Sequence, residues 1–271
     1  MPEGPLPIPQ VSAARMKQLT VTLIQYRYIS RGNFLMMNIL AIGAHPDDIE
    51  LGCGGTLIKA VREGHNVFMY TLTRGGASGE PSQRTDELKR SAKFIGAKDL
   101  RIDDFEDTRL TPGPELINHI ESYVNFADPD LIYTHSKKDI HHDHRAIATA
   151  TVEAARFSSN ILSYEIPLTK EFEPEVYFDI SDVIDEKVEL IEIFWSQNAK
   201  LYLKANAIKG LAEYRALQSR MGASVNYVET FEVEKLCLDK QFRLMKIPHA
   251  VGSARQIPEP EREIEYAWNK G

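Results

Sequence analysis

Between residues 38 and 156 the chain alternates short apolar runs with longer segments of helical periodicity. The expected strands are 38–43, 66–73, 100–102 and 131–134, and the expected helices are 51–62, 83–95, 114–126 and 145–156. Strands that alternate with helices at this spacing form βαβ units around a parallel sheet. The predicted fold is therefore α/β and Rossmann-like, a mainly parallel sheet flanked by helices, with its site at the C-terminal ends of the strands.

The two ends of the chain differ from this pattern. Four prolines fall in the first nine residues, and the last 25 residues are charged and contain three prolines. Between them, the later part of the folded region is expected to contain strands at 176–180 and 227–233 and helices at 182–194 and 205–220. We therefore expect an N-terminal extension at 1–36, a folded domain at 37–235 and a C-terminal extension at 236–271. Alternatively, the N-terminal residues form an ordinary strand or helix that packs on the core.

The composition excludes several classes of protein. Hydrophobic residues make up 43% of the chain, which is enough for a sizeable core. A net charge of −7 without a basic stripe argues against nucleic-acid binding, and the sequence contains no run long and apolar enough to span a membrane. Two cysteines, Cys53 and Cys237, indicate a reducing compartment rather than a disulfide framework, so we expect a cytoplasmic protein.

A cluster with metal-binding character follows the strand expected at 38–43. His45 and Asp48 are three residues apart, and Pro46 between them fixes one backbone angle, so both side chains can turn toward one point. One further histidine would complete a two-histidine, one-carboxylate set, which suits catalytic zinc and leaves a position open for water. Asp47, beside this set, is placed to act as the general base toward that water.

A second cluster follows the strand expected at 131–134. His141 and His144 are three residues apart at the start of a helix and share one face of it. One imidazole can ligate a metal while the other acts as an acid or as a donor to a developing oxyanion, and the spacing leaves open which does which. Asp139 and Asp143 can orient these imidazoles by accepting hydrogen bonds from them.

Each cluster alone has an ordinary explanation. Adjacent aspartates after a strand can cap a helix, and histidines can gather by chance in a polar loop. Because both clusters lie at expected strand ends of one sheet, the pair favours a metal-dependent hydrolase. The neighbouring glycines Gly52, Gly54 and Gly55 fit neither the dinucleotide fingerprint nor the P-loop, and we interpret them as close-packing residues.

Three motifs together resemble those of a known family. Ala44-His45-Pro46-Asp47-Asp48, Gly54-Gly55-Thr56-Leu57 and His141-x-Asp143-His144 are similar to the motifs of the LmbE-like or PIG-L family of zinc-dependent N-acetylglucosaminyl deacetylases. The resemblance extends over residues 38–235. Further positions that agree with it are Leu72-Thr73, Gly75, Arg84, Glu87, His135, Asp139, Lys187, Ser196-Gln197 and Tyr227-x-Glu229-x-Phe231.

The resemblance assigns roles that the spacing leaves open. It implies that His45, Asp48 and His144 are the zinc ligands and that Asp47 is the general base. It further implies that His141 stabilises the oxyanion or acts as the acid. His142 stands where members of the family usually carry proline.

Three residues are candidates for substrate contacts. Arg74 lies at a strand end, where a family member would contact substrate hydroxyls or an attached anion, and Asp107 lies in the loop after the third expected strand. Arg84 is the third candidate. Alternatively, Arg84 and Glu87 could pair with each other on the helix surface, one turn apart.

The expected function is zinc-dependent hydrolysis of the acetyl group from an N-acetylglucosamine-type amino sugar or its conjugate, with another divalent metal such as Fe²⁺ as the alternative cofactor. A zinc hydrolase of another small amide would share the same site. A non-catalytic sugar- or nucleotide-binding module, or an iron oxygenase with the same ligand set, are rivals from other classes. The expected partner is a small-molecule glycoside, and the sequence leaves the aglycone and homo-oligomer formation open.

Overall fold

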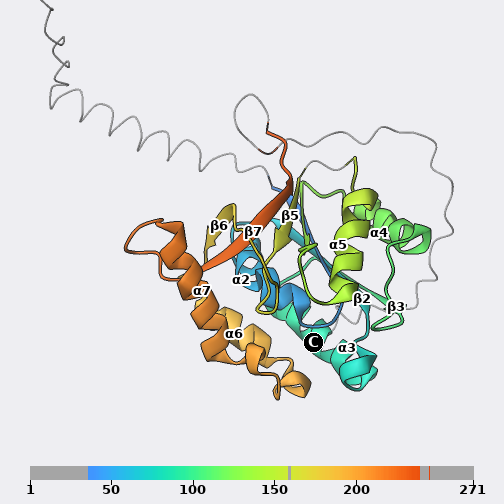
Figure 1. Ribbon diagram of the computed structural model, residues 1–271, viewed down its shortest axis with the longest axis horizontal. Helices are drawn as coiled ribbons and strands as arrows, with labels where there is room; N and C mark the ends of the chain where they lie inside the picture. Colours follow the sequence, from blue (N-terminus) through green and yellow to red (C-terminus); the bar gives the residue numbers. More distant parts are fainter. Residues whose placement is uncertain (1–35, 158–159, 239–243, 245–271) are drawn as a thin grey trace, which may run out of the picture. The chain divides into compact units, whose positions relative to one another are not determined.

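The computed structural model describes residues 36–157, 160–238 and 244. Their strands form one seven-stranded sheet in the order β3-β2-β1-β4-β5-β7-β6 (Figure 1). The strands are β1 (Asn38–Gly43), β2 (Asn66–Thr73), β3 (Asp99–Phe105), β4 (Leu131–His135), β5 (Ile161–Tyr164), β6 (Val176–Asp179) and β7 (Val228–Lys235). The expected extensions at 1–36 and 236–271 lie outside the described residues, apart from Met36, 236–238 and Leu244.

The sheet is parallel from β3 through β5, and β7 pairs antiparallel with both β5 and β6. The prediction of a mainly parallel sheet is confirmed. The chain proceeds from β1 to β2 on one side, whereas β4 lies on the other side of β1, so the strand order reverses between β1 and β4. Open α/β sheets bind ligands outside the carboxyl ends of the strands at such a reversal. Both sequence clusters follow these two strands.

Helices cover both faces of the sheet. On one face α4 packs with α5, and on the other face α2 packs with α3 and α6 (Figure 1). The helices are α2 (Asp48–Arg62), α3 (Pro81–Ile95), α4 (Pro114–Ala127), α5 (His142–Ala154), α6 (Ile184–Glu192) and α7 (Ala205–Ser219), with 3₁₀ turns η2 (Gly76–Ser78), η3 (Trp195–Gln197) and η4 (Leu201–Leu203). Among the described residues, none of the helices has both the length and the apolar character needed to cross a membrane.

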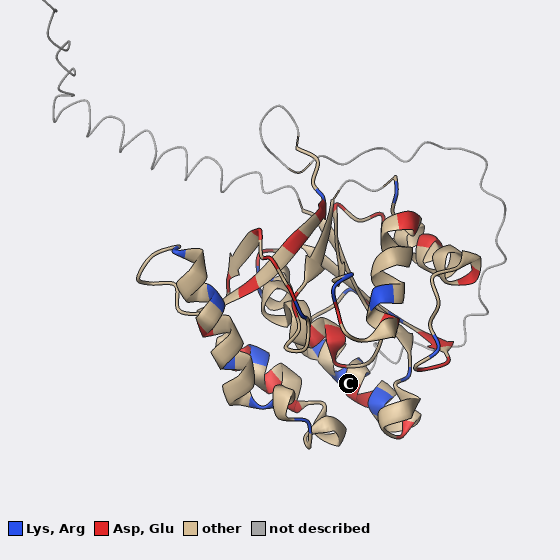
Figure 2. Ribbon diagram, viewed as in Figure 1, with Lys and Arg blue, Asp and Glu red and all other residues tan. Residues whose placement is uncertain are grey.

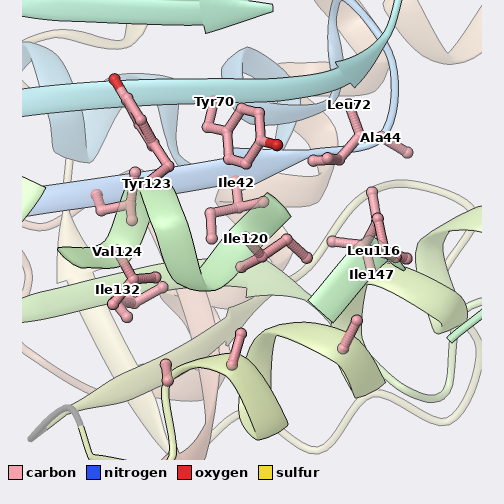
Figure 3. Close-up of a cluster of buried hydrophobic side chains, with 14 of the residues drawn as sticks. Ile42, Ala44, Tyr70, Leu72, Leu116, Ile120, Tyr123, Val124, Ile132 and Ile147 are labelled. Atoms are coloured by element: carbon pink, nitrogen blue, oxygen red, sulfur yellow. The ribbon is translucent and has the colours of Figure 1, made fainter. Parts of the chain in front are cut away.

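The hydrophobic core beneath α4 and α5 fixes these helices on the sheet. Alternate residues of β1 and β2 point to this face, as the two-residue period of a strand requires. The rings of Tyr70 and Tyr123 lie 4.9 Å apart, and Figure 3 shows Ile42 and Tyr70 beside Ile120 and Tyr123. Because Ile147 of α5 belongs to the same buried cluster, the start of α5 is fixed relative to β1.

The element boundaries differ from the sequence expectation where side chains determine the ends of helices. Helix α2 begins at Asp48 and α5 at His142, both earlier than the apolar periodicity indicates. Each first turn contains polar site residues, which apolar periodicity cannot detect. Strand β5 was not among the expected strands.

Candidate active site

The loop between β1 and α2 is folded around the carboxylate of Asp48. Its Oδ2 atom accepts hydrogen bonds from the backbone N–H groups of Ala44, at 3.1 Å, and His45, at 2.7 Å. Asp48 is the first residue of α2, so its side chain turns back over the loop that precedes the helix. This local contact fixes His45 and Asp48 relative to each other.

Three donor atoms from the two clusters form a nearly equilateral triangle. Nδ1 of His45 lies 3.3 Å from Oδ2 of Asp48, and Nε2 of His144 lies 3.4 Å from the same oxygen and 3.3 Å from the His45 nitrogen. Ligand atoms about 2.0–2.1 Å from a zinc ion at tetrahedral angles are about 3.3–3.4 Å apart. All three residues are buried, so these donors fit a metal ion with one position left open.

The outer nitrogens of both imidazoles face carboxylates. Nε2 of His45 lies 2.9 Å from Oδ1 of Asp107 and 3.1 Å from Oδ2 of Asp143. Nδ1 of His144 lies 3.2 Å from Oδ1 of Asp139. A carboxylate on the outer nitrogen keeps the proton there and leaves the inner nitrogen with its lone pair, as a ligand requires.

These carboxylates stabilise positive charge on the imidazoles of His45 and His144. Burial acts to lower the pKa of both histidines, but the neighbouring carboxylates outweigh it. They raise the pKa of His144 to about 9 and that of His45 well above its usual value. Protons and a divalent cation compete for the same nitrogens, so a metal can replace the protons that the carboxylates favour.

Asp47 has an unusual backbone and a buried carboxylate. Its φ of 110° lies in the left-handed region, which costs a non-glycine residue about 1–3 kcal/mol. Burial raises the pKa of Asp47 to about 6, against the opposing charge of Arg84. A carboxylate with a pKa close to neutrality is well matched to proton transfer. The strained position therefore presents a candidate base beside the triangle.

Arg84 anchors this strained loop from within the protein. Its guanidinium group donates to Oδ2 of Asp47 at 3.2 Å, to the carbonyl of Gly75 at 3.0 Å and to Oγ of Ser78 at 2.7 Å. It also donates to the carbonyl of Pro46. The side chain is 1% exposed, so Arg84 is placed to position Asp47 rather than to meet a substrate from solvent.

The alternative of a surface pair between Arg84 and Glu87 is wrong. Glu87 is also buried, and its carboxylate accepts hydrogen bonds from the backbone N–H and the hydroxyl of Ser196 at 2.9 and 2.6 Å. The two residues therefore serve different contacts, one toward the β1–α2 loop and one toward η3.

His141 lies next to the triangle but outside it. Its ring centroid is 4.9 Å from that of His45 and 4.6 Å from that of His144. Its Nδ1 atom accepts a hydrogen bond from the backbone N–H of Asp143 at 3.2 Å, which leaves Nε2 to carry the proton. Burial and the neighbouring His144 lower the pKa of His141, so it is disposed to be a neutral donor.

His142 faces a different set of partners. Its Nε2 atom lies 2.5 Å from the carbonyl oxygen of Thr108 and 3.0 Å from Oδ1 of Asp143. Its side chain is half exposed. Its contacts are therefore with the loop after β3 and not with the donor triangle.

Two of the expected substrate contacts have protein partners. Asp107 is largely buried, and besides His45 it accepts the backbone N–H of Ala77 at 2.8 Å. Burial opposes ionisation of Asp107, but the hydrogen bond with His45 outweighs it and lowers the pKa to about 2. Arg74 is half exposed, and its Nε atom lies 3.2 Å from Oδ1 of Asp104. Of Asp107 and Arg74, only Arg74 is open to solvent.

His135, which was identified only through the family resemblance, contacts two residues of the triangle, Asp48 and His144. Its Nε2 atom accepts the backbone N–H of Ala44 at 3.0 Å and lies 3.2 Å from Oδ2 of Asp48. Its ring stacks on that of His144 with centroids 3.9 Å apart. Burial lowers the pKa of His135 to about 4, so its ring is neutral and packs as a plane against His144.

Lys200 is a site residue that sequence reasoning missed. Lys200 lies in the chain between η3 and η4, and its Nζ atom is 3.9 Å from Oδ2 of Asp47. No local pattern marks this segment, because it approaches the β1–α2 loop only through the fold. The nearby glutamine and serine of the Ser196-Gln197 pair were found only through the resemblance.

Comparison with known proteins places the chain among known deacetylases and their relatives. The model of the family described as "PIG-L: GlcNAc-PI de-N-acetylase" matches residues 40–155, the stretch that contains both clusters. A protein of Escherichia coli (strain K12) named "Uncharacterized deacetylase YaiS" is 33% identical over 152 residues, which cover 53% of this chain and 82% of that protein.

The chain belongs to the PIG-L family. The chain is also similar to the "Diacetylchitobiose deacetylase" of Thermococcus kodakarensis. The two are 29% identical over 185 residues, which cover 59% of this chain and 69% of that protein. The crystal structure of the conserved protein TT1542 from Thermus thermophilus superposes with a TM-score of 0.67 at 25% identity, over 77% of this chain and 99% of that chain. The PIG-L chain thus shares its fold with a solved structure over nearly all of that structure.

Proposed function

We propose that this protein is a zinc-dependent N-deacetylase that hydrolyses the acetamide of an N-acetylglucosamine-type amino sugar or its conjugate. The observation that carries the proposal is the triangle of His45, Asp48 and His144, whose donor atoms are 3.3–3.4 Å apart, with Asp47 and His141 beside it. Family membership supports the reaction, and the names of the relatives support an N-acetylated sugar as substrate.

The metal would be held by Nδ1 of His45, Oδ2 of Asp48 and Nε2 of His144. Two nitrogen ligands and one carboxylate suit zinc, and an iron(II) ion is the alternative for such a set. When bound, such an ion polarises the substrate carbonyl and lowers the pKa of water to near neutrality. Asp107 and Asp143 orient His45, and Asp139 orients His144, through the contacts described above.

The remaining steps fall to residues of the chain itself. Asp47 accepts a proton from the attacking water, and the oxygen of that water forms a bond to the amide carbon. The N–H at Nε2 of His141 donates a hydrogen bond to the carbonyl oxygen as it becomes negative. Asp47, now protonated, returns the proton to the amine nitrogen as the C–N bond breaks. The products are acetate and a free amino sugar.

Of the three residues expected to contact substrate, Arg74 remains proposed for that role because its side chain is half exposed at the end of β2. Arg84 and Asp107 act through Asp47 and His45. Lys200, partly exposed and beside Asp47, joins Arg74 as a group that a substrate can reach. The described parts of the proposed domain at 37–235 contain every one of these residues. The two unpaired cysteines fit a cytoplasmic location.

The test is acetate release from a panel of N-acetylglucosamine conjugates, with N-acetylated amino acids as the comparison. We expect release from the sugars, loss of activity on chelation and recovery with zinc at one ion per chain. Activity confined to the amino acids would favour a hydrolase of another small amide. Full activity after verified metal removal would overturn the mechanism, and metal binding without activity on any amide would favour a binding module.

A further inference from the structure

Helix α2, which begins with Asp48, is broken one turn later. Cys53 has non-helical backbone angles, φ −142° and ψ 16°, inside the helix. The break lies where the helix passes very close to β5: a β-carbon on Gly52 would be 2.2 Å from the ring of Tyr164, whose hydroxyl donates to the carbonyl of Ile42 at 2.9 Å. A β-carbon on Gly54 would likewise be 2.8 Å from Leu190 and one on Gly55 3.0 Å from Ile180, so the interpretation of these glycines as close-packing residues is confirmed. The first turn of α2 is a separate unit that carries Asp48.

An ion pair bridges this break. In a regular helix the N–H of Gly55 would donate to the carbonyl of Leu51, four residues earlier. Here the Gly55 N–H donates to Oε1 of Glu229 at 2.8 Å, and the Leu51 carbonyl accepts from Nζ of Lys187 at 2.7 Å. Lys187 and Glu229 are themselves 2.6 Å apart. The pair thus connects the carbonyl end of the first turn to the amide end of the second.

Glu229 also caps the second part of the helix. Its Oε2 atom accepts the N–H of Thr56 at 2.7 Å and the hydroxyl of the same residue. Two backbone amides at a helix start, together with a lysine, satisfy one carboxylate fully. Glu229 comes from β7, whose glutamates are the red bands along that strand in Figure 2, and Lys187 comes from α6.

Stability alone is a poor explanation for this pair. Lys187 is 5% exposed and Glu229 is 4% exposed. Removing two charges from water costs about as much as their attraction returns, so apolar residues of similar volume often stabilise a protein as well or better. Apolar residues, however, cannot form hydrogen bonds to the backbone groups that the break in α2 exposes.

We propose that Lys187 and Glu229 are positioning residues that hold the first turn of α2, and with it Asp47 and Asp48, in the geometry of the metal site. The inference rests on the metal site proposed above. Leu51, the residue that Lys187 holds, is three residues after Asp48 on the same turn. Metal–ligand distances must be kept to within about 0.2 Å, so a small rotation of this turn would open the triangle.

The experiment removes both charges at similar volume, in the double variant Lys187→Met/Glu229→Gln of the full chain. Zinc affinity is measured by competition with a chromophoric chelator, and coordination geometry by the visible absorption of the Co²⁺-loaded protein. We expect zinc affinity to fall about 10–100-fold, the usual effect of losing support behind a ligand, with a changed cobalt spectrum. Circular dichroism is expected to stay as in the wild type.

A second buried ion pair offers a matched control. Nε of Arg215 lies 2.7 Å from Oε2 of Glu165, which also accepts the hydroxyl of Thr230 at 2.7 Å. This pair lines the same cavity of about 20 Å³ as Lys187 and Glu229, and among the described contacts it makes no hydrogen bond to α2. Arg215→Met/Glu165→Gln should therefore keep wild-type zinc affinity and the wild-type cobalt spectrum.

The outcomes separate this inference from the proposed function. Wild-type affinity in the Lys187/Glu229 double variant, or an equal loss in both double variants, would overturn the inference. A wild-type protein that binds neither zinc nor cobalt would overturn the metal site itself. If the double variant does not fold, Thr56→Val serves instead: it removes one hydrogen bond to Glu229 at constant shape and should weaken zinc binding by a smaller factor, and unchanged affinity there would overturn the inference.

Discussion

Nη2 of Arg84 lies 3.2 Å from Oδ2 of Asp47, and both side chains are almost fully buried. The two residues belong to α3 and to the β1–α2 loop, so a helix that supplies none of the triangle's donor atoms determines where the candidate base lies. Burial raises the pKa of Asp47, the positive charge of Arg84 lowers it, and the balance is a pKa of about 6. Arg84 thus contributes to both the position and the ionisation of Asp47.

Replacing Arg84 should move the acid limb of the pH–rate profile. In Arg84→Met the pKa of Asp47 rises because the opposing charge is gone, so the base is protonated up to a higher pH. The acid limb of kcat/KM should then shift upward by about 1 pH unit. Arg84→Lys keeps a cation and should shift it less. An unchanged acid limb in Arg84→Met, with activity retained, would show that Asp47 is not the group that sets it.

The adjacent aspartates should separate by metal content. Asp47→Asn removes the base but not a ligand, so we expect wild-type metal content and a fall in kcat of at least about 10²-fold. Asp48→Asn should lower the metal content, because Oδ2 of Asp48 is one corner of the triangle. Metal analysis of the two purified variants decides the matter. The reverse pattern would mean that the two carboxylates exchange roles.

The two histidines of the second cluster should separate in the same way. His144→Ala is expected to deplete the metal, since Nε2 of His144 belongs to the triangle. His141→Ala should keep the metal and lose about 10²–10³ in kcat, the scale of one oxyanion donor. The measurement is kcat with metal content for each variant, and a metal-free His141→Ala protein would contradict the assignment.

His142 should be dispensable for catalysis. Its imidazole contacts Thr108 and Asp143 and is half exposed, so His142→Pro, the residue usual in the family, should retain most of the activity. Proline at the first position of a helix is well tolerated. If His142→Ala were as damaging as His141→Ala is expected to be, while His141→Ala was mild, the assignment of this motif would be shifted by one residue.

Asp107 offers a test between two roles. As the partner of His45 it should act on the metal, so Asp107→Asn is expected to lower zinc affinity about 10–100-fold with a modest effect on KM. As a substrate contact it would instead raise KM at unchanged zinc affinity. Chelator competition and steady-state kinetics on the same preparation distinguish the two, and Arg74→Met is the comparison expected to raise KM alone.

The sequence by itself determined the parallel core of the fold and the two polar clusters that form the candidate metal site. Alternating apolar runs and helical periods defined β1 to β4, because both signals are local. The spacing of His45 and Asp48 around Pro46 sufficed to direct two donors to one point, since only a short loop separates them. The second cluster could be assigned to the same place because carboxyl ends of parallel strands share an edge.

The tertiary structure alone decided which groups support those donors. Asp107 became a partner of His45, Arg84 was drawn into the interior beneath Asp47, and Lys200 reached the site from beyond α6. The antiparallel β7 brought Glu229 to Lys187 at the break in α2. Each contact joins segments far apart in the chain, and local periodicity carries no information about such pairs. They form because folding brings these segments together, and the polar groups that it buries must find hydrogen-bond partners within the protein.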